Sequence, residues 1–553
     1  MDSSKFIFSA DRRPQLITEL ESRTFDLVII GGGITGAGIA LDAATRGLSV
    51  ALVEKNDFAS GTSSKSTKLI HGGLRYLKNF EFGLVKRVGK ERSIVYQNAP
   101  HLVVREKMLL PLIEGGSFGK FSTKIGLWIY DRLAKVKSSE KRIMLNSDQA
   151  IAKEPLLKKA GLKGAGYYSE YRTDDARLTL EVMKTAASHG AICMNYASCV
   201  QLFVSEDYIV CKDEIGGAEF KVKGKKVVNA TGPWVDHLRS KEETISGKRL
   251  HHTKGVHLVV SREKLPINHS VYFDVSDGRM IFAIPRFDVT YFGTTDTNYS
   301  TEGDQNTTTS QLGEPGVDMN DVMYLLNGVN SMFPSANLKQ TDILSSWSGL
   351  RPLIHEDGKS PSELSRKDEV FISSSGLISI AGGKLTGYRL MAKKVVDLVC
   401  EKLNLQQECR TENVKLIGGD FKHIDLVENY IRSLRARMKG NGLPEEETEY
   451  LVRTFGKQSD IILDKCRAFE EEELVQALAW FCLRNEQVST LSDFYIRRTG
   501  YLYFRPGKVN ATMELVIPAF AKFLNWDQDR IVSERATMTS RLSEITNFSN
   551  GEA

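Results

Sequence analysis

The chain has 553 residues, a net charge of +5 and 41% hydrophobic residues, which is typical of a soluble globular protein built from roughly three compact units. No apolar run approaches the about 18 residues that a membrane-spanning helix needs, and the mild charge gives no basis for nucleic-acid binding. The N-terminus lacks the apolar core of a signal peptide, and the seven cysteines lack metal-ligand spacing. We therefore expect a cytoplasmic protein with reduced thiols and no metal site.

The first predicted elements form a β-α-β unit. An apolar run at 25–30 predicts a strand that is buried on both faces. Small and apolar residues at 34–47 predict a helix ending at a glycine, and 49–55 predicts a second strand. This order is typical of a parallel sheet covered by helices.

The turn of this unit carries a dinucleotide-binding pattern. Gly31, Gly33 and Gly36 follow the first strand in GxGxxG spacing, which suits a tight turn, a close approach to a pyrophosphate and close helix–strand packing. The helix N-terminus would supply N–H groups for the anion. Glu54 ends the second strand, where its carboxylate would bind the adenosine ribose and repel the extra phosphate of NADP.

The segment at 62–77 combines hydroxyls, basic side chains and a glycine pair. We expect its hydroxyls on the pyrophosphate side of the bound dinucleotide and its glycines beside the cofactor ring. These residues are Thr62, Ser63, Ser64, Gly72 and Gly73. Whether Lys65 or Lys68 also contacts an anion stays open.

A basic amphipathic stretch is predicted at 116–137. Apolar side chains such as Phe121 and Trp128 recur there at helical spacing between lysines and an arginine. Such a stretch suits an anionic membrane surface. A helix packed on its own protein would explain the pattern equally well.

Two later segments repeat the pattern of an apolar strand that breaks into a small-residue turn, at 225–236 and 376–399. With the first strand they predict one discontinuous parallel sheet. Their turns contain Gly232, Gly382 and Gly383, which suit backbone contacts along a whole flavin cofactor, so we favour FAD over NAD.

The fold class follows from the remaining patterns. Two-residue alternation at 270–297 predicts antiparallel hairpins, and charged helical periodicity begins near 418 and ends in a frayed tail of about a dozen residues. We predict an α/β fold in which a discontinuous FAD-binding Rossmann-like domain is interleaved with an antiparallel β-sheet substrate or capping domain and followed by a C-terminal helical domain. The respective boundaries are 20–95, 150–250 and 345–410; 96–149 and 251–344; and 411–553.

Several long motifs occur in a characteristic order: GGGITGAGIALDAATRGLSV, TSSKSTKLIHGGLRYL, YRTDDARL, VVNATGPWVD, SGLRPLI and AGGKLTGYR. Over roughly residues 20–400 the chain thereby resembles the FAD-dependent glycerol-3-phosphate dehydrogenases of the glycine-oxidase and D-amino-acid-oxidase structural group, and its helical C-terminal region fits as well. The resemblance implies noncovalent FAD and the oxidation of sn-glycerol 3-phosphate to dihydroxyacetone phosphate in glycerol catabolism. Hydride would pass to flavin N5 and electrons to a quinone.

A phosphate substrate needs convergent cations. The candidate substrate-binding residues are Arg75, Tyr76, His257, Arg351, Arg366 and Lys384. His257, Arg351 and Lys384 are also the catalytic candidates, with His257 as the base near the C2 hydroxyl that the resemblance implies. A histidine on a strand is otherwise often a core residue, and Arg366 lies in a charged loop that fits a surface equally well.

A quinone acceptor lies in the bilayer, so we expect peripheral contact with the inner face of the cell membrane, and a homodimer is also considered. Three alternatives stay open. They are a glycerol-3-phosphate oxidase that uses O₂, an amine or amino-acid oxidase, and a noncatalytic flavin-binding redox module.

Overall fold

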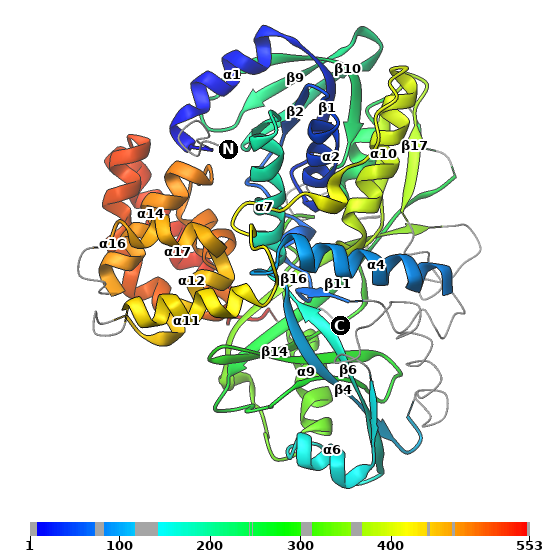
Figure 1. Ribbon diagram of the computed structural model, residues 1–553, viewed down its shortest axis with the longest axis vertical. Helices are drawn as coiled ribbons and strands as arrows, with labels where there is room; N and C mark the ends of the chain where they lie inside the picture. Colours follow the sequence, from blue (N-terminus) through cyan, green and yellow to red (C-terminus); the bar gives the residue numbers. More distant parts are fainter. Residues whose placement is uncertain are drawn as a thin grey trace.

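The computed structural model describes residues 8–71, 82–116, 142–242, 244–245, 247–299, 312–355, 368–438, 443–466 and 471–549. Two sheets lie one above the other along the long axis, and a group of helices drawn in yellow, orange and red lies beside them (Figure 1). This arrangement confirms the predicted α/β fold with a C-terminal helical domain.

The first sheet is parallel at its centre, where β18, β10, β1, β2 and β7 are neighbours. Its strands are β1 (Thr24–Ile30), β2 (Val50–Val53), β7 (Ile192–Met194), β8 (Ala197–Phe203), β9 (Tyr208–Asp213), β10 (Glu219–Asn229), β17 (Glu369–Ile372) and β18 (Ile378–Ala381). Leu27, Val28 and Ile29 of β1 are fully buried, because helices cover the central strands. The three predicted strand-turn segments therefore do meet in one sheet, with β10 between β1 and β18.

The second sheet is mostly antiparallel. Its strands are β3 (Leu69–Ile70), β4 (Val104–Ile113), β5 (Ile143–Leu145), β6 (Leu162–Arg172), β11 (Arg249–Ser261), β12 (Ser270–Asp274), β13 (Met280–Arg286), β14 (Val289–Gly293), β15 (Thr297–Tyr299) and β16 (Ile343–His355). β12, β13 and β14 form the predicted hairpins. The long strands β11 and β16 pair along nearly their whole length, which aligns His257 with Trp347 and Thr253 with Arg351.

Three strands belong to a different sheet from the one that the predicted domain boundaries imply. β3, β6 and β16 fall within the ranges expected for the FAD-binding domain but hydrogen-bond into the second sheet. Strand pairing is decided by partners far away in the sequence, so local patterns cannot assign a strand to one of two sheets. The chain therefore crosses between the sheets more often than the boundaries suggest.

Helices accompany both sheets and make up the C-terminal helical domain. They are α1 (Arg13–Ser22), α2 (Ile34–Thr45), α4 (Phe82–Asn98), α6 (Ser147–Lys153), α7 (Asp175–Ser188), α8 (Val235–Arg239), α9 (Met319–Met332), α10 (Tyr388–Lys402), α11 (Leu426–Met438), α12 (Glu445–Phe455), α13 (Ser459–Leu463), α14 (Glu471–Asn485), α15 (Tyr501–Phe504), α16 (Pro506–Leu524) and α17 (Gln528–Glu544). α2 ends just before Gly47, whose φ is +88°, as the sequence predicts.

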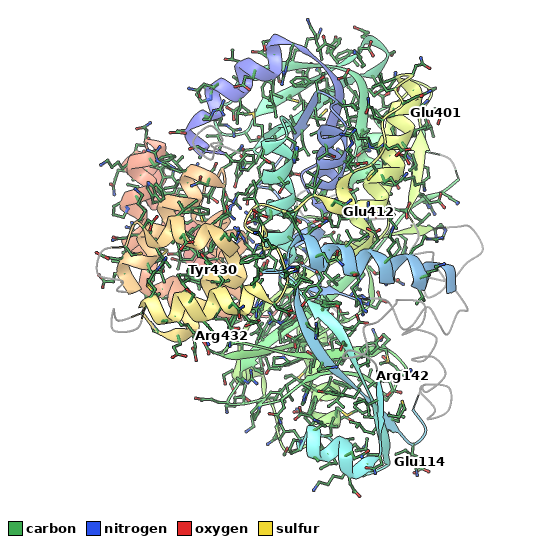
Figure 2. The ribbon with its side chains drawn as sticks, in the orientation of Figure 1. Glu114, Arg142, Glu401, Glu412, Tyr430 and Arg432 are labelled. Carbon is green, nitrogen blue, oxygen red and sulfur yellow. The ribbon has the colours of Figure 1, made fainter. Side chains whose placement is uncertain are left out.

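α7 joins the helical domain to the first sheet (Figure 1). Arg177 and Lys184 of α7 both pair with the buried Glu486 of the helical domain. Tyr430 and Arg432, labelled in Figure 2, mark α11 at the lower edge of that domain as drawn, whereas Glu114 lies at the far end of the second sheet. The helical domain is thus anchored through buried charge on α7.

The structure describes the chain as far as residue 549, and α17 continues to Glu544, so the frayed tail predicted for about the last dozen residues is wrong for its described part. The Ser346 hydroxyl donates to the carbonyl of Ile545, and the Met319 amide donates to the carbonyl of Ser549. These contacts hold the segment against β16 and α9, partners that lie some 200 residues or more away in the sequence. Among the described residues, no helix has the length and apolar character needed to cross a bilayer.

Candidate functional site

A cavity of about 1020 Å³ lies where the strand ends of the first sheet meet the helical domain. Its walls include the turns after β1, β10 and β18 and the residues that follow β2. The carboxyl ends of parallel strands are the usual ligand edge of such a sheet. The volume lies at the upper end of the roughly 300–1,000 Å³ typical of ligand pockets, which suits a large cofactor.

The GxGxxG turn is packed so tightly that only glycine fits. A Cβ on Gly36 would lie 1.9 Å from the Gly31 carbonyl oxygen. A Cβ on Gly31, whose φ is +114°, would lie 2.6 Å from the carbonyl oxygen of Ala230 on the neighbouring strand-turn segment. Gly33 caps α2, and the next amide, of Ile34, donates to the Ser63 hydroxyl at 2.9 Å. The start of α2 therefore stands close to the cavity with its N–H groups toward it.

Glu54 lines the same cavity at the end of β2. Its carboxylate accepts from the amide of Gly32 at 2.6 Å and from the amide of Asn56 at 2.9 Å. Burial raises the pKa of Glu54 to about 7, against the opposing effect of these two amides. A carboxylate placed here is positioned to accept further hydrogen bonds from a ligand.

Most of the other predicted cofactor residues also line the cavity. They are Thr62, Ser63, Gly232, Gly382, Gly383 and Lys384. The Thr62 hydroxyl donates to the carbonyl of Leu350 at 2.7 Å. Ser64 is buried, donates to the Gly61 carbonyl and does not line the cavity, because the turn at Thr62–Ser64 directs it inward.

The two lysines of this segment contact other parts of the protein. Lys68 is buried, donates to the Ser64 carbonyl at 2.9 Å and pairs with Asp175 of α7 at 2.5 Å. Lys65 donates to the carbonyl of Gly313, and burial lowers its pKa to about 8. Lys68 therefore has a structural partner, whereas the Lys65 ammonium contacts only a backbone carbonyl among the described residues.

His257 lies in β11 of the second sheet, opposite Trp347 of the paired strand β16. Its ring is 1% exposed and stacks on Trp347 with 4.8 Å between ring centroids. Nε2 hydrogen-bonds to the Thr67 hydroxyl at 2.9 Å, whereas Nδ1 has no hydrogen-bond partner among the residues that the structure describes. Burial holds the pKa of His257 well below its ordinary value, and Arg351 and Lys68 lower it further. His257 is therefore neutral, and it does not line the cavity.

Arg351 lies near His257 on the paired strand β16. Its guanidinium donates to the Thr294 hydroxyl at 2.8 Å, to the Thr295 carbonyl at 3.2 Å and to Asp296 at 3.0 Å. Its neighbour Pro352 lines the cavity, but Arg351 does not. The pairing of β11 with β16 brings two of the predicted catalytic residues together beside the cavity.

Several predicted site residues lie outside the described residues. They are Gly72, Gly73, Arg75, Tyr76 and Arg366, together with the amphipathic stretch from 117 onward. Their predicted roles stay predictions.

The sequence analysis missed the contribution of the helical domain to the cavity wall. Asp493 and Arg497 from the π-helical segment Asp493–Arg498, and Arg541 from α17, also line the cavity. Asp57 and Tyr196 complete this side. A signal was present, because Arg497 and Arg498 stand together between the apolar segments of FYIRRTGYLY, an unusual place for two solvated charges.

A family model for FAD-dependent oxidoreductases matches residues 26–389, and a model for the C-terminal domain of alpha-glycerophosphate oxidase matches residues 409–531. The aerobic glycerol-3-phosphate dehydrogenase of Bacillus subtilis is 48% identical over 94% of this chain and 95% of its own length. This chain belongs to that FAD-dependent family. Its cofactor is FAD, as the cavity and its glycine turns lead one to expect.

Two solved structures place the fold. The glycerol-3-phosphate dehydrogenase of Bacillus halodurans, determined in complex with FAD, is 40% identical and covers 99% of this chain and 100% of its own, with a TM-score of 0.83. The glycine oxidase of Geobacillus kaustophilus is 21% identical and covers 72% of this chain and 99% of its own, with a TM-score of 0.51. The latter likeness concerns the fold alone and confirms the predicted structural group.

Proposed function

We propose that the protein oxidises sn-glycerol 3-phosphate to dihydroxyacetone phosphate and passes the electrons to a quinone. The observation that carries this proposal is the 48% identity, over 94% of this chain, to an aerobic glycerol-3-phosphate dehydrogenase. The cavity, whose glycine turns suit FAD, supports it. In this reaction the substrate loses a hydride from C2 and a proton from the C2 hydroxyl. Bound FAD supplies the two-electron acceptor.

The residues of the first sheet hold and orient the cofactor in this proposal. The tight turn at Gly31 and Gly36 and the N-terminus of α2 bind the pyrophosphate, and Glu54 binds the adenosine ribose. The turns at Gly232 and Gly382–Gly383 supply backbone contacts along the other half. Lys384 follows the last of these turns and lines the cavity, where its charge can bind the substrate phosphate or the cofactor.

His257 is our proposed acceptor for the hydroxyl proton. A base must be uncharged before it acts, and burial lowers the pKa of His257, which favours the neutral imidazole and at the same time weakens it as a base. Thr67 fixes the ring through Nε2, and within the described part of the chain Nδ1 has no hydrogen-bond partner. The His257 ring does not line the cavity. Its role as the base therefore requires the substrate to reach the face of the sheet that β11 and β16 share.

Arg351 is our proposed phosphate ligand on that face. Its fork of donors already holds Thr294 and Asp296 at 2.8 and 3.0 Å, which orients the guanidinium. A charge-assisted hydrogen bond contributes roughly 1.5–3 kcal/mol. Arg351→Lys keeps the charge but loses the fork, so KM for glycerol 3-phosphate should rise about 10- to 100-fold while the flavin spectrum stays unchanged. Arg535→Lys, at a partly exposed arginine of the helical domain that donates twice to Glu514, is the matched control.

The decisive experiment is anaerobic mixing of the FAD-loaded protein with glycerol 3-phosphate while flavin absorbance is followed. Bleaching is expected, followed by reoxidation with a soluble quinone. Absence of bleaching would refute the proposed substrate and favour a noncatalytic flavin module. Bleaching followed by rapid reoxidation with O₂ and peroxide release would instead identify an oxidase, an outcome that the match to an alpha-glycerophosphate oxidase domain makes worth measuring.

A quinone acceptor requires contact with a membrane surface. The support for this part of the proposal is the basic amphipathic pattern at 116–137. Co-sedimentation with anionic liposomes should fall when Trp128 and Phe121 are both replaced by serine. Unchanged binding of this variant would remove the segment as an anchor.

A further inference from the structure

The helical domain closes one side of the FAD cavity through a cluster of buried charges. We infer that Arg497 and Arg498 hold the loop after β2 in place, and through it Glu54, so that the helical domain positions the binding site for the adenosine end of FAD. The cluster consists of Asp57, Tyr196, Asp493, Arg497 and Arg498. This inference concerns cofactor binding and does not depend on the proposed substrate.

Asp57 is the centre of the cluster and is fully buried. Its carboxylate accepts from Arg497 Nε at 2.5 Å, from Arg498 Nη1 at 2.6 Å and from Arg498 Nη2 at 2.8 Å. Burial alone would raise the pKa of Asp57, but the two guanidinium groups outweigh it and lower the pKa to about 2. Asp57 is therefore ionised. Its hydrogen bonds to the two arginines leave the buried carboxylate one favoured position.

A second contact joins the same elements. Arg497 Nη2 donates to Asp493 at 2.6 Å, and the Tyr196 hydroxyl donates to Asp493 at 2.8 Å. The Tyr196 amide in turn donates to the carbonyl of Asn56 at 2.9 Å. The loop at 54–57 is thus held from both sides, by Arg497 and Arg498 through Asp57 and by Tyr196 through Asn56.

This loop carries Glu54, the residue that we propose to bind the adenosine ribose. Glu54 lies three positions before Asp57, and its carboxylate already depends on the amide of Asn56 within the same loop. Arg497 also opposes the effect of burial on the pKa of Glu54. Because Asp57, Asp493 and Arg497 line the cavity beside Glu54, a shift of the helical domain would move the Glu54 carboxylate relative to bound adenosine.

The test uses Arg497→Lys, which keeps the charge but cannot donate to Asp57 and Asp493 as a rigid fork. Flavin-free full-length protein is titrated with FAD, with ADP and with FMN by calorimetry. The dissociation constants for FAD and ADP should rise by roughly 10-fold or more, because a displaced Glu54 would lose its charge-assisted hydrogen bond to the ribose. That for FMN, which lacks the adenosine, should change less than about twofold.

Arg505→Lys is the matched control, since Arg505 forms a buried pair with Glu447 in the same domain, 2.7 Å apart, and does not line the cavity. It should leave all three dissociation constants unchanged. If Arg497→Lys leaves FAD and ADP binding unchanged, or weakens FMN binding as much as ADP binding, the inference is overturned.

A measurement on the unmodified protein guards against a variant that fails to fold. Hydrogen–deuterium exchange with and without FAD should show slower exchange for amides at 489–498 in the helical domain as well as at 31–36 and 54–57. Slower exchange confined to the first sheet would also overturn the inference, because FAD would then bind without the helical domain.

Discussion

Replacing Gly36 by alanine is the sharpest single test of the cofactor site. The new Cβ would lie 1.9 Å from the Gly31 carbonyl oxygen, whereas a carbon and an oxygen normally approach to about 3.3 Å. The two groups must therefore separate by about 1.4 Å. Gly31 is itself held in place, because its amide donates to the Val53 carbonyl at 2.8 Å.

The movement has to come from α2, which would tilt away from β1 and carry the amides of Gly33 and Ile34 with it. Overpacking of this kind costs about 3 kcal/mol or more. We expect the thermal midpoint to fall and FAD affinity to decrease at least 10-fold, because a helix N-terminus displaced by more than about 1 Å would lose the hydrogen bonds that we propose it donates to the pyrophosphate.

The assay is calorimetric titration of flavin-free protein with FAD, together with thermal unfolding in the absence of FAD. Gly507→Ala is the matched control, because Gly507 is exposed in the first turn of α16 and a Cβ there meets nothing within 4 Å. It should leave FAD affinity unchanged and stabilise the protein by up to about 1 kcal/mol. If Gly36→Ala binds FAD as tightly as Gly507→Ala does, the close packing of this turn does not determine cofactor binding.

Two further predictions rest on buried carboxylates. Folding raises the pKa of Glu54 from 4.5 to about 7, so its ionised form destabilises the flavin-free protein above pH 7 and this penalty disappears as the pH falls toward 4.5. Denaturant unfolding should show that the free energy of unfolding falls between pH 5 and pH 8 by about 2 kcal/mol more in wild type than in Glu54→Gln. An equal fall in both proteins would contradict the raised pKa of Glu54. Lys68→Met leaves Asp175 buried without its cation and should lower the free energy of unfolding by about 3–5 kcal/mol. Adding Asp175→Asn should restore part of that loss, and an unchanged denaturant midpoint for Lys68→Met would refute the structural role of the pair.

Through the network around Asp57, the helical domain contributes to the cofactor cavity, which the sequence predicted to be formed by the first sheet. Arg177 and Lys184 of α7 pair with Glu486, whose backbone carbonyl accepts from Arg498 at 2.7 Å. The charges that anchor the domain and those beside the cavity are therefore continuous. In such a network the loss of one partner is felt by the others.

The sequence by itself determined the local units. The β-α-β turn was predictable because strand, glycine spacing and helix follow one another within a few residues, and sterics at Gly31 and Gly36 leave little choice of geometry. The hairpins around Gly278, whose φ is +80°, were predictable for the same reason. The family motifs extended this to the cofactor and to the order of the domains.

Only the tertiary structure decided which distant segments meet. β16 pairs with β11 rather than joining the first sheet, and that pairing is what buries His257 against Trp347. Asp57 and Arg497 are separated by 440 positions in the sequence, so no local pattern could join them. The physical reason is that a buried charge is stable only when it is paired. The sequence shows which residues carry a charge, but only the fold determines which partner each buried charge meets.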